Sequence, residues 1–227
     1  MNRRTRCRVV NEFQLARSHV NKNESKCASD SNSQKMNPNL VVAIGASAGG
    51  FQEIVKIVES LPADFAGSLV IATHRAPGYK NTLADILAYK ATVRVDEPED
   101  EECLECTTIY VGSPNDTVEI DGDQFDIEDD RSDYARMHRI DDLFESVARS
   151  AGKNAVGIIL SGMLYDGTAG LKAIYDAGGR CVIQSPRDAQ YADMPKNALA
   201  EVDPDFLGTT SQICDYISAL AAGRHCQ

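Results

Sequence analysis

Several features that define special classes of protein are missing from this sequence of 227 residues. It contains no tryptophan, and aromatic residues make up only 6% of the chain. No run of about 18 apolar residues occurs, which argues against a membrane-spanning helix. The arginine-rich first residues are not followed by the apolar core of a secretory signal. We therefore expect a cytoplasmic protein without direct membrane insertion, and the 43% of hydrophobic residues favours an ordinary globular domain.

Cysteines are present, but their spacing does not indicate a disulfide framework or a metal site. Seven cysteines are an odd number scattered over a chain that is large enough to bury its own core, so no disulfide framework is implied. Cys103 and Cys106 have the spacing of a metal knuckle. A structural zinc site needs a second pair or histidine partners at similar spacing, and none follows. We predict no metal and no cofactor.

Positive charge is scarce beyond residue 37. Residues 1–37 hold 8 Lys and Arg against 3 Asp and Glu, whereas residues 38–227 hold 15 against 31, a formal net charge of −16. Such an acidic domain repels nucleic-acid backbones, so we predict no nucleic-acid partner. The Asn-, Ser- and Lys-rich start lacks apolar periodicity and is typical of a flexible basic N-terminal extension over residues 1–37, followed by one domain over residues 38–227.

Short apolar runs alternate with longer amphipathic segments in this domain, which predicts parallel strands joined by helices that cover both faces of a sheet. The expected strands are Leu40–Ile44, Leu69–Ala72, Thr92–Val95, Ala155–Leu160 and Arg180–Ile183. The expected helices are Phe51–Ser60, Thr82–Lys90, Asp141–Ala151, Gly167–Ala177, Pro195–Ala200 and Ser211–Ala222. The fold class is thus α/β, a three-layer α/β/α sandwich with a mainly parallel sheet.

The middle of the chain departs from this alternation. Thr107–Val111, Thr117–Ile120 and Gln124–Ile127 are predicted short strands, and the last two are joined at Asp121-Gly122, a strong hairpin signal. We expect an inserted antiparallel hairpin here.

The most informative local motif is Gly45-Ala46-Ser47-Ala48-Gly49-Gly50, between a predicted strand and a predicted helix. A serine in Gly-x-Ser-x-Gly at such a turn is lifted clear of the sheet and faces helix N–H groups, which suits a nucleophile. The same string is also similar to a phosphate or dinucleotide loop. A nicotinamide-dependent reductase of that kind would need a Tyr-x-x-x-Lys pair, and no tyrosine of the chain has a lysine four residues on.

Two other strand ends carry suitable partners. His74 follows the strand Leu69–Ala72, and Asp166 follows the strand Ala155–Leu160. The carboxyl ends of parallel strands share one edge of a sheet, so Ser47, His74 and Asp166 can converge in a Ser/His/Asp set for acyl transfer. Taken singly, Ser47 is as typical of a turn as of a nucleophile, His74 is more typical of a surface or loop histidine, and Asp166 is typical of a helix N-cap. His138 is the only rival base.

Several motifs in series then identify a resemblance. Val41–Gly50, His74 with Pro77-Gly78, Asp141–Ala148, and Asn154–Met163 with Asp166-Gly167 together resemble the catalytic domain of the CheB-type chemotaxis protein-glutamate methylesterases. The match runs from about Leu40 to the C-terminus. It implies hydrolysis of glutamate γ-methyl esters on a methyl-accepting chemoreceptor, with release of methanol, and some members of the family also deamidate glutamine.

The resemblance also implies roles for individual residues. Ser47 is the expected nucleophile, His74 the general base and Asp166 its orienting carboxylate, and backbone N–H groups of Ala48 and Met163 are the expected oxyanion donors. The residues expected around the substrate pocket are Gly45, Ala46, Gly49, Gly50, Gly162, Leu164, Tyr165 and Met194.

The chain departs from the family pattern at defined positions. Leu164-Tyr165 stands where the family usually has Gly-x, which predicts a narrowed or reshaped pocket. Met137-His138-Arg139 replaces Arg-Pro-Ser, which predicts altered receptor docking. The first 37 residues are too few for the usual receiver domain. The alternative function is a non-catalytic signalling scaffold that has the esterase fold and binds a receptor or a methyltransferase.

Overall fold

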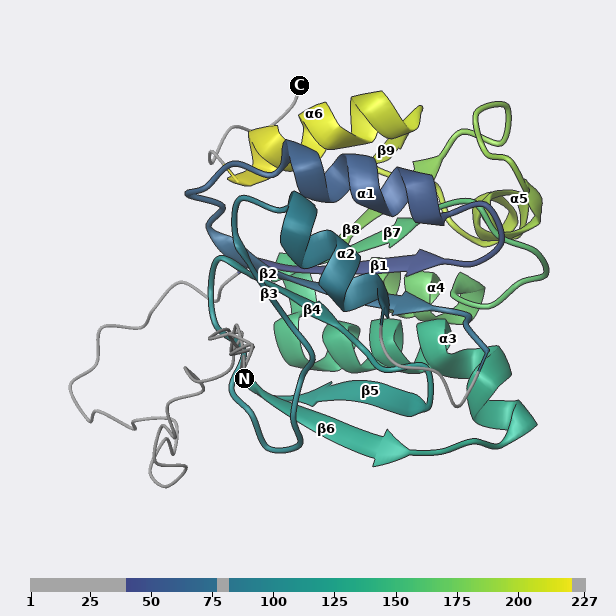
Figure 1. Ribbon diagram of the computed structural model, residues 1–227. Helices are drawn as coiled ribbons and strands as arrows, with labels where there is room; N and C mark the ends of the chain where they lie inside the picture. Colours follow the sequence, from purple (N-terminus) through teal and green to yellow (C-terminus); the bar gives the residue numbers. More distant parts are fainter. Residues whose placement is uncertain (1–39, 77–81, 222–227) are drawn as a thin grey trace, which may run out of the picture. The chain divides into compact units, whose positions relative to one another are not determined.

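The computed structural model describes residues 40–76 and 82–221 (Figure 1). The expected extension over residues 1–37 and the Pro77-Gly78 turn lie outside these described residues. Within them, no helix is both long enough and apolar enough to cross a bilayer.

A seven-stranded sheet forms the centre of the fold, in the order β3-β4-β2-β1-β7-β8-β9. Every pair of neighbouring strands is parallel, which confirms the predicted sheet. The short strand β9 was not expected from the sequence. The strands are β1 (Leu40–Ala46), β2 (Gly67–Thr73), β3 (Arg94–Asp96), β4 (Thr108–Val111), β7 (Ala155–Ile159), β8 (Arg180–Gln184) and β9 (Phe206–Gly208).

Helices cover both faces of the sheet, which gives the predicted three layers (Figure 1). One face packs against α1 (Phe51–Ser60), α2 (Thr82–Lys90) and α6 (Thr210–Ala221). The other packs against α3 (Asp133–Ala151), α4 (Thr168–Asp176) and α5 (Asp193–Glu201), with a short 3-10 turn (Gly152–Asn154) between α3 and β7. Helical spacing explains the burial, since Ile54, Ile57 and Val58 share the inner side of α1. Each such aliphatic side chain stabilises the fold by about 1.5–3 kcal/mol.

The predicted antiparallel hairpin is confirmed, but the predicted strand before it belongs to the main sheet. Only β5 (Asp116–Asp121) and β6 (Gln124–Asp129) form the hairpin, whereas the segment predicted as Thr107–Val111 is β4 and pairs parallel with β2 and β3. The two-residue loop is Gly122-Asp123, one residue later than predicted, because Gly122 takes the positive φ of 64° at its first position. The hairpin packs its apolar face on the outer side of α3.

Helix α3 begins at Asp133, eight residues before the predicted start at Asp141. The Oγ atom of Ser132 caps it by accepting a hydrogen bond from the Ala135 N–H at 3.1 Å. The first two turns are mostly polar, so apolar periodicity did not indicate them. This extension brings additional side chains to the edge of the sheet where the candidate site lies.

Candidate active site

Ser47, His74 and Asp166 lie at the carboxyl ends of three adjacent strands. Ser47 directly follows β1, His74 directly follows β2, and Asp166 is in the loop between β7 and α4. The sheet order places β1 between β2 and β7, so residues that are distant in sequence meet at one edge.

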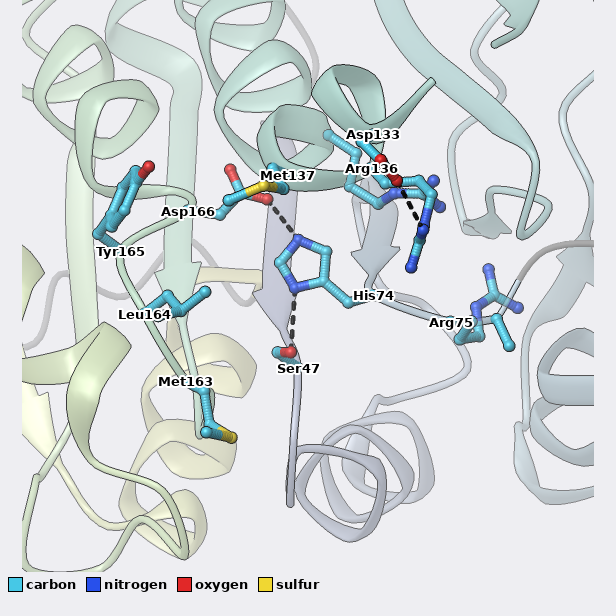
Figure 2. Close-up of a pocket in the computed structure, with 12 residues that line it drawn as sticks. Ser47, His74, Arg75, Asp133, Arg136, Met137, Met163, Leu164, Tyr165 and Asp166 are labelled. Atoms are coloured by element: carbon cyan, nitrogen blue, oxygen red, sulfur yellow. Dashed lines mark hydrogen bonds and ion pairs between the residues drawn. The ribbon is translucent and has the colours of Figure 1, made fainter. Parts of the chain in front are cut away.

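The three side chains form a hydrogen-bonded chain (Figure 2). The Nδ1 atom of His74 lies 3.0 Å from the Oγ atom of Ser47, and its Nε2 atom lies 2.7 Å from Oδ2 of Asp166. When the ring is neutral, a proton on Nε2 is donated to the carboxylate and Nδ1 remains free to accept the serine proton. The arrangement is therefore competent for general-base activation of the serine.

Asp166 is held rigidly because it is only 3% exposed. Besides the histidine, its Oδ2 atom accepts the Ile140 N–H at 3.1 Å and its Oδ1 atom accepts the Asp141 N–H at 3.0 Å. Both donors belong to α3, so this helix orients the carboxylate toward His74.

Asp141 extends this network behind the site. Its Oδ1 atom accepts the Gly170 N–H of α4 at 2.8 Å. Burial raises the pKa of Asp141 to about 6, and the nearby charge of Asp166 acts in the same direction. His138, the rival base, lies beside this residue, with Nδ1 3.9 Å from Asp141 Oδ2, and it does not line the cavity described below.

A second network holds the turn that carries Ser47. The Ser47 N–H donates to the Ser161 carbonyl at 3.0 Å, and the Ser161 Oγ donates to the Ala48 carbonyl at 2.8 Å. The buried Gln184 side chain accepts the Ser161 N–H at 2.7 Å. The sequence analysis missed Ser161 and Gln184, although a polar residue at the end of a buried strand was a usable signal for both.

A cavity of about 550 Å³ opens beside the Ser47 and His74 side chains. Its two sides differ in chemistry, and Figure 2 shows Leu164 and Tyr165 on one side of His74 and Arg75 and Arg136 on the other. The lining residues are Ser47, His74, Arg75, Ala76, Asp133, Arg136, Met137, Arg139, Met163, Leu164, Tyr165 and Asp166.

The comparisons with known proteins agree with this architecture. The family model described as CheB methylesterase matches residues 42–217. The chain belongs to the CheB methylesterase family. Curated relatives named protein-glutamate methylesterase/protein-glutamine glutaminase include that of Salmonella typhi, which is 32% identical over 77% of this chain and 49% of its own length. That of Escherichia coli strain K12 is 34% identical over 70% of this chain and 46% of its own length. The chain thus spans about half the length of these relatives.

The fold matches a solved structure of the same family. The catalytic domain of the Thermotoga maritima CheB methylesterase superimposes with a TM-score of 0.73 at 24% identity, covering 80% of this chain and 98% of that one. This similarity supports the layered α/β fold.

Leu164 stands where the family resemblance led us to expect a glycine, and the structure gives its backbone conformation. Its φ angle of 65° lies in the left-handed region, which favours glycine. The leucine retains that conformation, and its side chain, 56% exposed, lines the cavity together with Tyr165. The side chain of Leu164, rather than a change of the backbone path, thus shapes the cavity at this position.

Six of the eight predicted pocket residues support the site from behind instead of lining the cavity, namely Gly45, Ala46, Gly49, Gly50, Gly162 and Met194. Gly49 has a φ of 80°, and a Cβ atom there would lie 2.7 Å from the Ser161 Oγ. At Gly162 a Cβ atom would lie 1.9 Å from the sulfur of the buried Met194. These positions allow close packing of the turn, so their small size is structural.

Four lining residues come from α3, and the sequence analysis had connected two of them, Met137 and Arg139, with receptor docking rather than with the cavity. Asp133, Arg136, Met137 and Arg139 reach the cavity because that helix begins earlier than predicted. The described part of the chain contains no group of three or more His, Cys, Asp or Glu side chains that could hold a metal.

Proposed function

We propose that this chain is a protein-glutamate methylesterase that hydrolyses glutamate γ-methyl esters by a Ser-His-Asp mechanism. The observation that carries the proposal is the hydrogen-bonded chain from Ser47 through His74 to Asp166 beside an open cavity. Family membership and the names of the curated relatives support the same reaction.

In the first half of the reaction, the Ser47 Oγ atom attacks the ester carbonyl while His74 Nδ1 takes the serine proton. Asp166 stabilises the imidazolium through Nε2 and keeps the ring oriented. The tetrahedral intermediate then collapses, Nδ1 protonates the departing methoxide, and methanol leaves a glutamyl ester on Ser47.

Backbone N–H groups of Ala48 and Met163 are the proposed oxyanion donors. Neither N–H donates a hydrogen bond to any acceptor within residues 40–76 and 82–221, so both are available for a ligand. Such a donor contributes about 2.7–4 kcal/mol to the transition state in a comparable hydrolase.

In the second half, water attacks the acyl-enzyme while His74 Nδ1 takes a water proton, and the returned proton restores Ser47 as the glutamate carboxylate leaves. The same attack on a glutamine amide would release ammonia. The relatives are named for both activities, methylesterase and glutaminase.

The proposed partner is a methylated chemoreceptor or a similar methylated signalling protein, and the proposed location is the cytoplasm, where such receptor helices lie. Residues 38–227 are proposed as the catalytic domain, which contains all three reacting side chains and every described element.

The decisive experiment measures methanol release from a methylated chemoreceptor cytoplasmic fragment by the wild type and by Ser47→Ala. Release that depends on Ser47 supports the esterase. If neither protein releases methanol while circular dichroism shows an intact fold, the esterase proposal fails for that receptor. Serine labelling by phenylmethylsulfonyl fluoride then separates an esterase with another substrate from the non-catalytic scaffold.

A further inference from the structure

One side of the cavity beside Ser47 and His74 carries positive charge, although the domain as a whole is acidic. Residues 38–227 carry 31 acidic against 15 basic residues. Three arginines nevertheless line this one cavity, Arg75 from the end of β2 and Arg136 and Arg139 from α3. Apart from the Asp166 that binds His74, Asp133 is the only acidic residue that residues 40–76 and 82–221 contribute to the lining.

Arg139 is the most constrained of the three. It is only 4% exposed, and its Nη1 atom donates to the Pro114 carbonyl at 3.1 Å. Its Nε atom is buried without a hydrogen-bond partner, and it forms no ion pair with a carboxylate among the residues described. The carboxylates of Asp166 and Asp116 act on this buried cation without pairing with it directly. A ligand carboxylate in direct contact with the guanidinium would therefore be stabilised.

Arg75 places a second guanidinium next to the first. It donates a hydrogen bond to the Gly112 carbonyl. Burial and then the charge of Arg139 lower the pKa of Arg75 to about 10. Burial likewise lowers the pKa of Arg139. The two cations repel each other, and the charges of Glu97 and Asp116 offset this only in part. A ligand carboxylate in the cavity would offset it further.

Arg136 completes this side at the surface, paired with Asp133 at 3.0 Å. The uncharged methyl ester itself offers no negative charge for three cations to bind. An acidic side chain on the same peptide would offer one, because guanidinium groups bind carboxylates through charge-assisted, often paired hydrogen bonds. On a substrate helix, residues three or four positions apart lie side by side, so a neighbouring glutamate would accompany the ester into the cavity.

We propose that Arg75, Arg136 and Arg139 form a carboxylate-binding subsite that selects substrates with an acidic residue one helical turn from the esterified glutamate. This proposal rests on the proposed esterase function and adds the class of sequence that the site prefers. The apolar residues Met163, Leu164 and Tyr165 lie on the other side of the reacting serine (Figure 2). The preferred helix is therefore acidic on one side of its ester and apolar on the other.

The test compares two helical peptides that carry the same glutamate γ-methyl ester and differ only in Glu or Gln four residues away. The wild type is expected to show a kcat/KM about tenfold higher for the Glu peptide. High salt should reduce this preference through screening. Two variants should each lower the ratio of kcat/KM for the Glu peptide to kcat/KM for the Gln peptide toward unity. They are Arg139→Met, which keeps the side-chain volume, and Arg136→Gln, at an exposed position where a change does not endanger folding.

Arg149→Gln is the matched control, because Arg149 is an exposed arginine that pairs with Glu119 away from the cavity. Its preference should equal that of the wild type. Equal kcat/KM for the two peptides in the wild type, or equal losses for both peptides in the arginine variants, would overturn the subsite.

The same experiment separates failure of the subsite from failure of the esterase. If methanol release depends on Ser47 but is equally efficient for the Glu and the Gln peptide, the subsite alone is rejected. No release from either peptide rejects the esterase, and binding of fluorescent peptides to Ser47→Ala then decides the subsite independently. In that measurement the Glu peptide should bind about tenfold more tightly than the Gln peptide, and equal affinities would reject the subsite.

Discussion

Leu164 and Asn197 are joined by a hydrogen bond of 2.6 Å from the Asn197 side-chain amide to the Leu164 carbonyl. This contact ties the loop after β7 to α5 while Leu164 has a left-handed φ of 65°. A side chain in this conformation costs about 1–2 kcal/mol because Cβ crowds the following carbonyl. The backbone of this loop is therefore strained at Leu164, the residue whose side chain lines the cavity.

Leu164→Gly should raise the free energy of unfolding by about 0.5–1 kcal/mol, since glycine removes the strain but adds freedom to the unfolded chain. The leucine is 56% exposed, so little buried surface is lost. Urea unfolding of Leu164→Ala supplies the control, because alanine removes the bulk and keeps the strain. Equal destabilisation in the two variants would contradict a strained backbone at this position.

The same Leu164→Gly variant should accept larger esters. Removing the leucine widens the apolar side of the cavity, so the ratio of kcat/KM for a propyl ester to that for a methyl ester should rise about tenfold, the usual effect of one or two methylene groups in a pocket. Steady-state hydrolysis of the two ester peptides measures it. An unchanged ratio would show that Leu164 does not limit the size of the substrate.

Asp166→Asn should lower kcat by about 10³–10⁴-fold with little change in KM, because the amide no longer holds His74 in the productive form. The amide NH₂ would also face N–H donors from Ile140, Asp141 or His74, so unfolding should require about 1–3 kcal/mol less. Methanol release and urea unfolding measure the two effects. Asp129→Asn, at an exposed carboxylate paired with Arg131, should change neither.

Asp141 should make the folded protein less stable as pH rises. Burial raises its folded pKa from the ordinary value of 3.8 to about 6. Between these values the native state binds more protons than the unfolded state, so the free energy of unfolding contributed by this group falls with increasing pH. The contribution is favourable below the unfolded pKa and is lost as the pH passes the folded pKa.

Asp141→Asn removes this titration, and its amide oxygen can still accept the Gly170 N–H. Urea unfolding from about pH 4 to 7 should therefore show a stability that falls less with pH in the variant than in the wild type. Parallel curves would mean that Asp141 titrates normally in the folded state. Asp142 also has a pKa raised to about 6 by burial, so part of the slope should remain.

Ser161→Ala should affect both stability and catalysis. Its hydroxyl donates to the Ala48 carbonyl and accepts the Tyr191 N–H at 2.9 Å. Its loss leaves these partly buried groups without this partner, at a cost of about 1–3 kcal/mol. The turn that carries Ser47 would also shift, and kcat should fall more than KM changes.

Ser68→Ala is the matched control for that variant. The buried Ser68 hydroxyl donates to the Glu105 carbonyl at 2.9 Å near the start of β2, at the end of the strand away from His74. It should lose comparable stability and retain kcat. A Ser161→Ala variant that kept full kcat would refute the positioning role.

Features of the site that depend on residues close together in the sequence could be predicted, whereas features that depend on contacts between distant segments could not. Glycine spacing around Ser47 and the strand ends at His74 and Asp166 are local signals, and parallel strands bring such ends to one edge. Asp133 and Arg136 were missed because they lie in the first turns of α3, which lack apolar periodicity. Ser161 and Gln184 were missed because their partners come from other strands and loops.

The sequence by itself determined the alternation of strands and helices and placed Ser47, His74 and Asp166 at strand ends, because apolar periodicity and strand polarity are properties of the chain. Only the tertiary structure decided that β1 lies between β2 and β7, that Nδ1 of His74 faces the serine, and that Arg139 is buried beside the cavity. Those features depend on which distant segments pack together, and packing is a property of the whole fold.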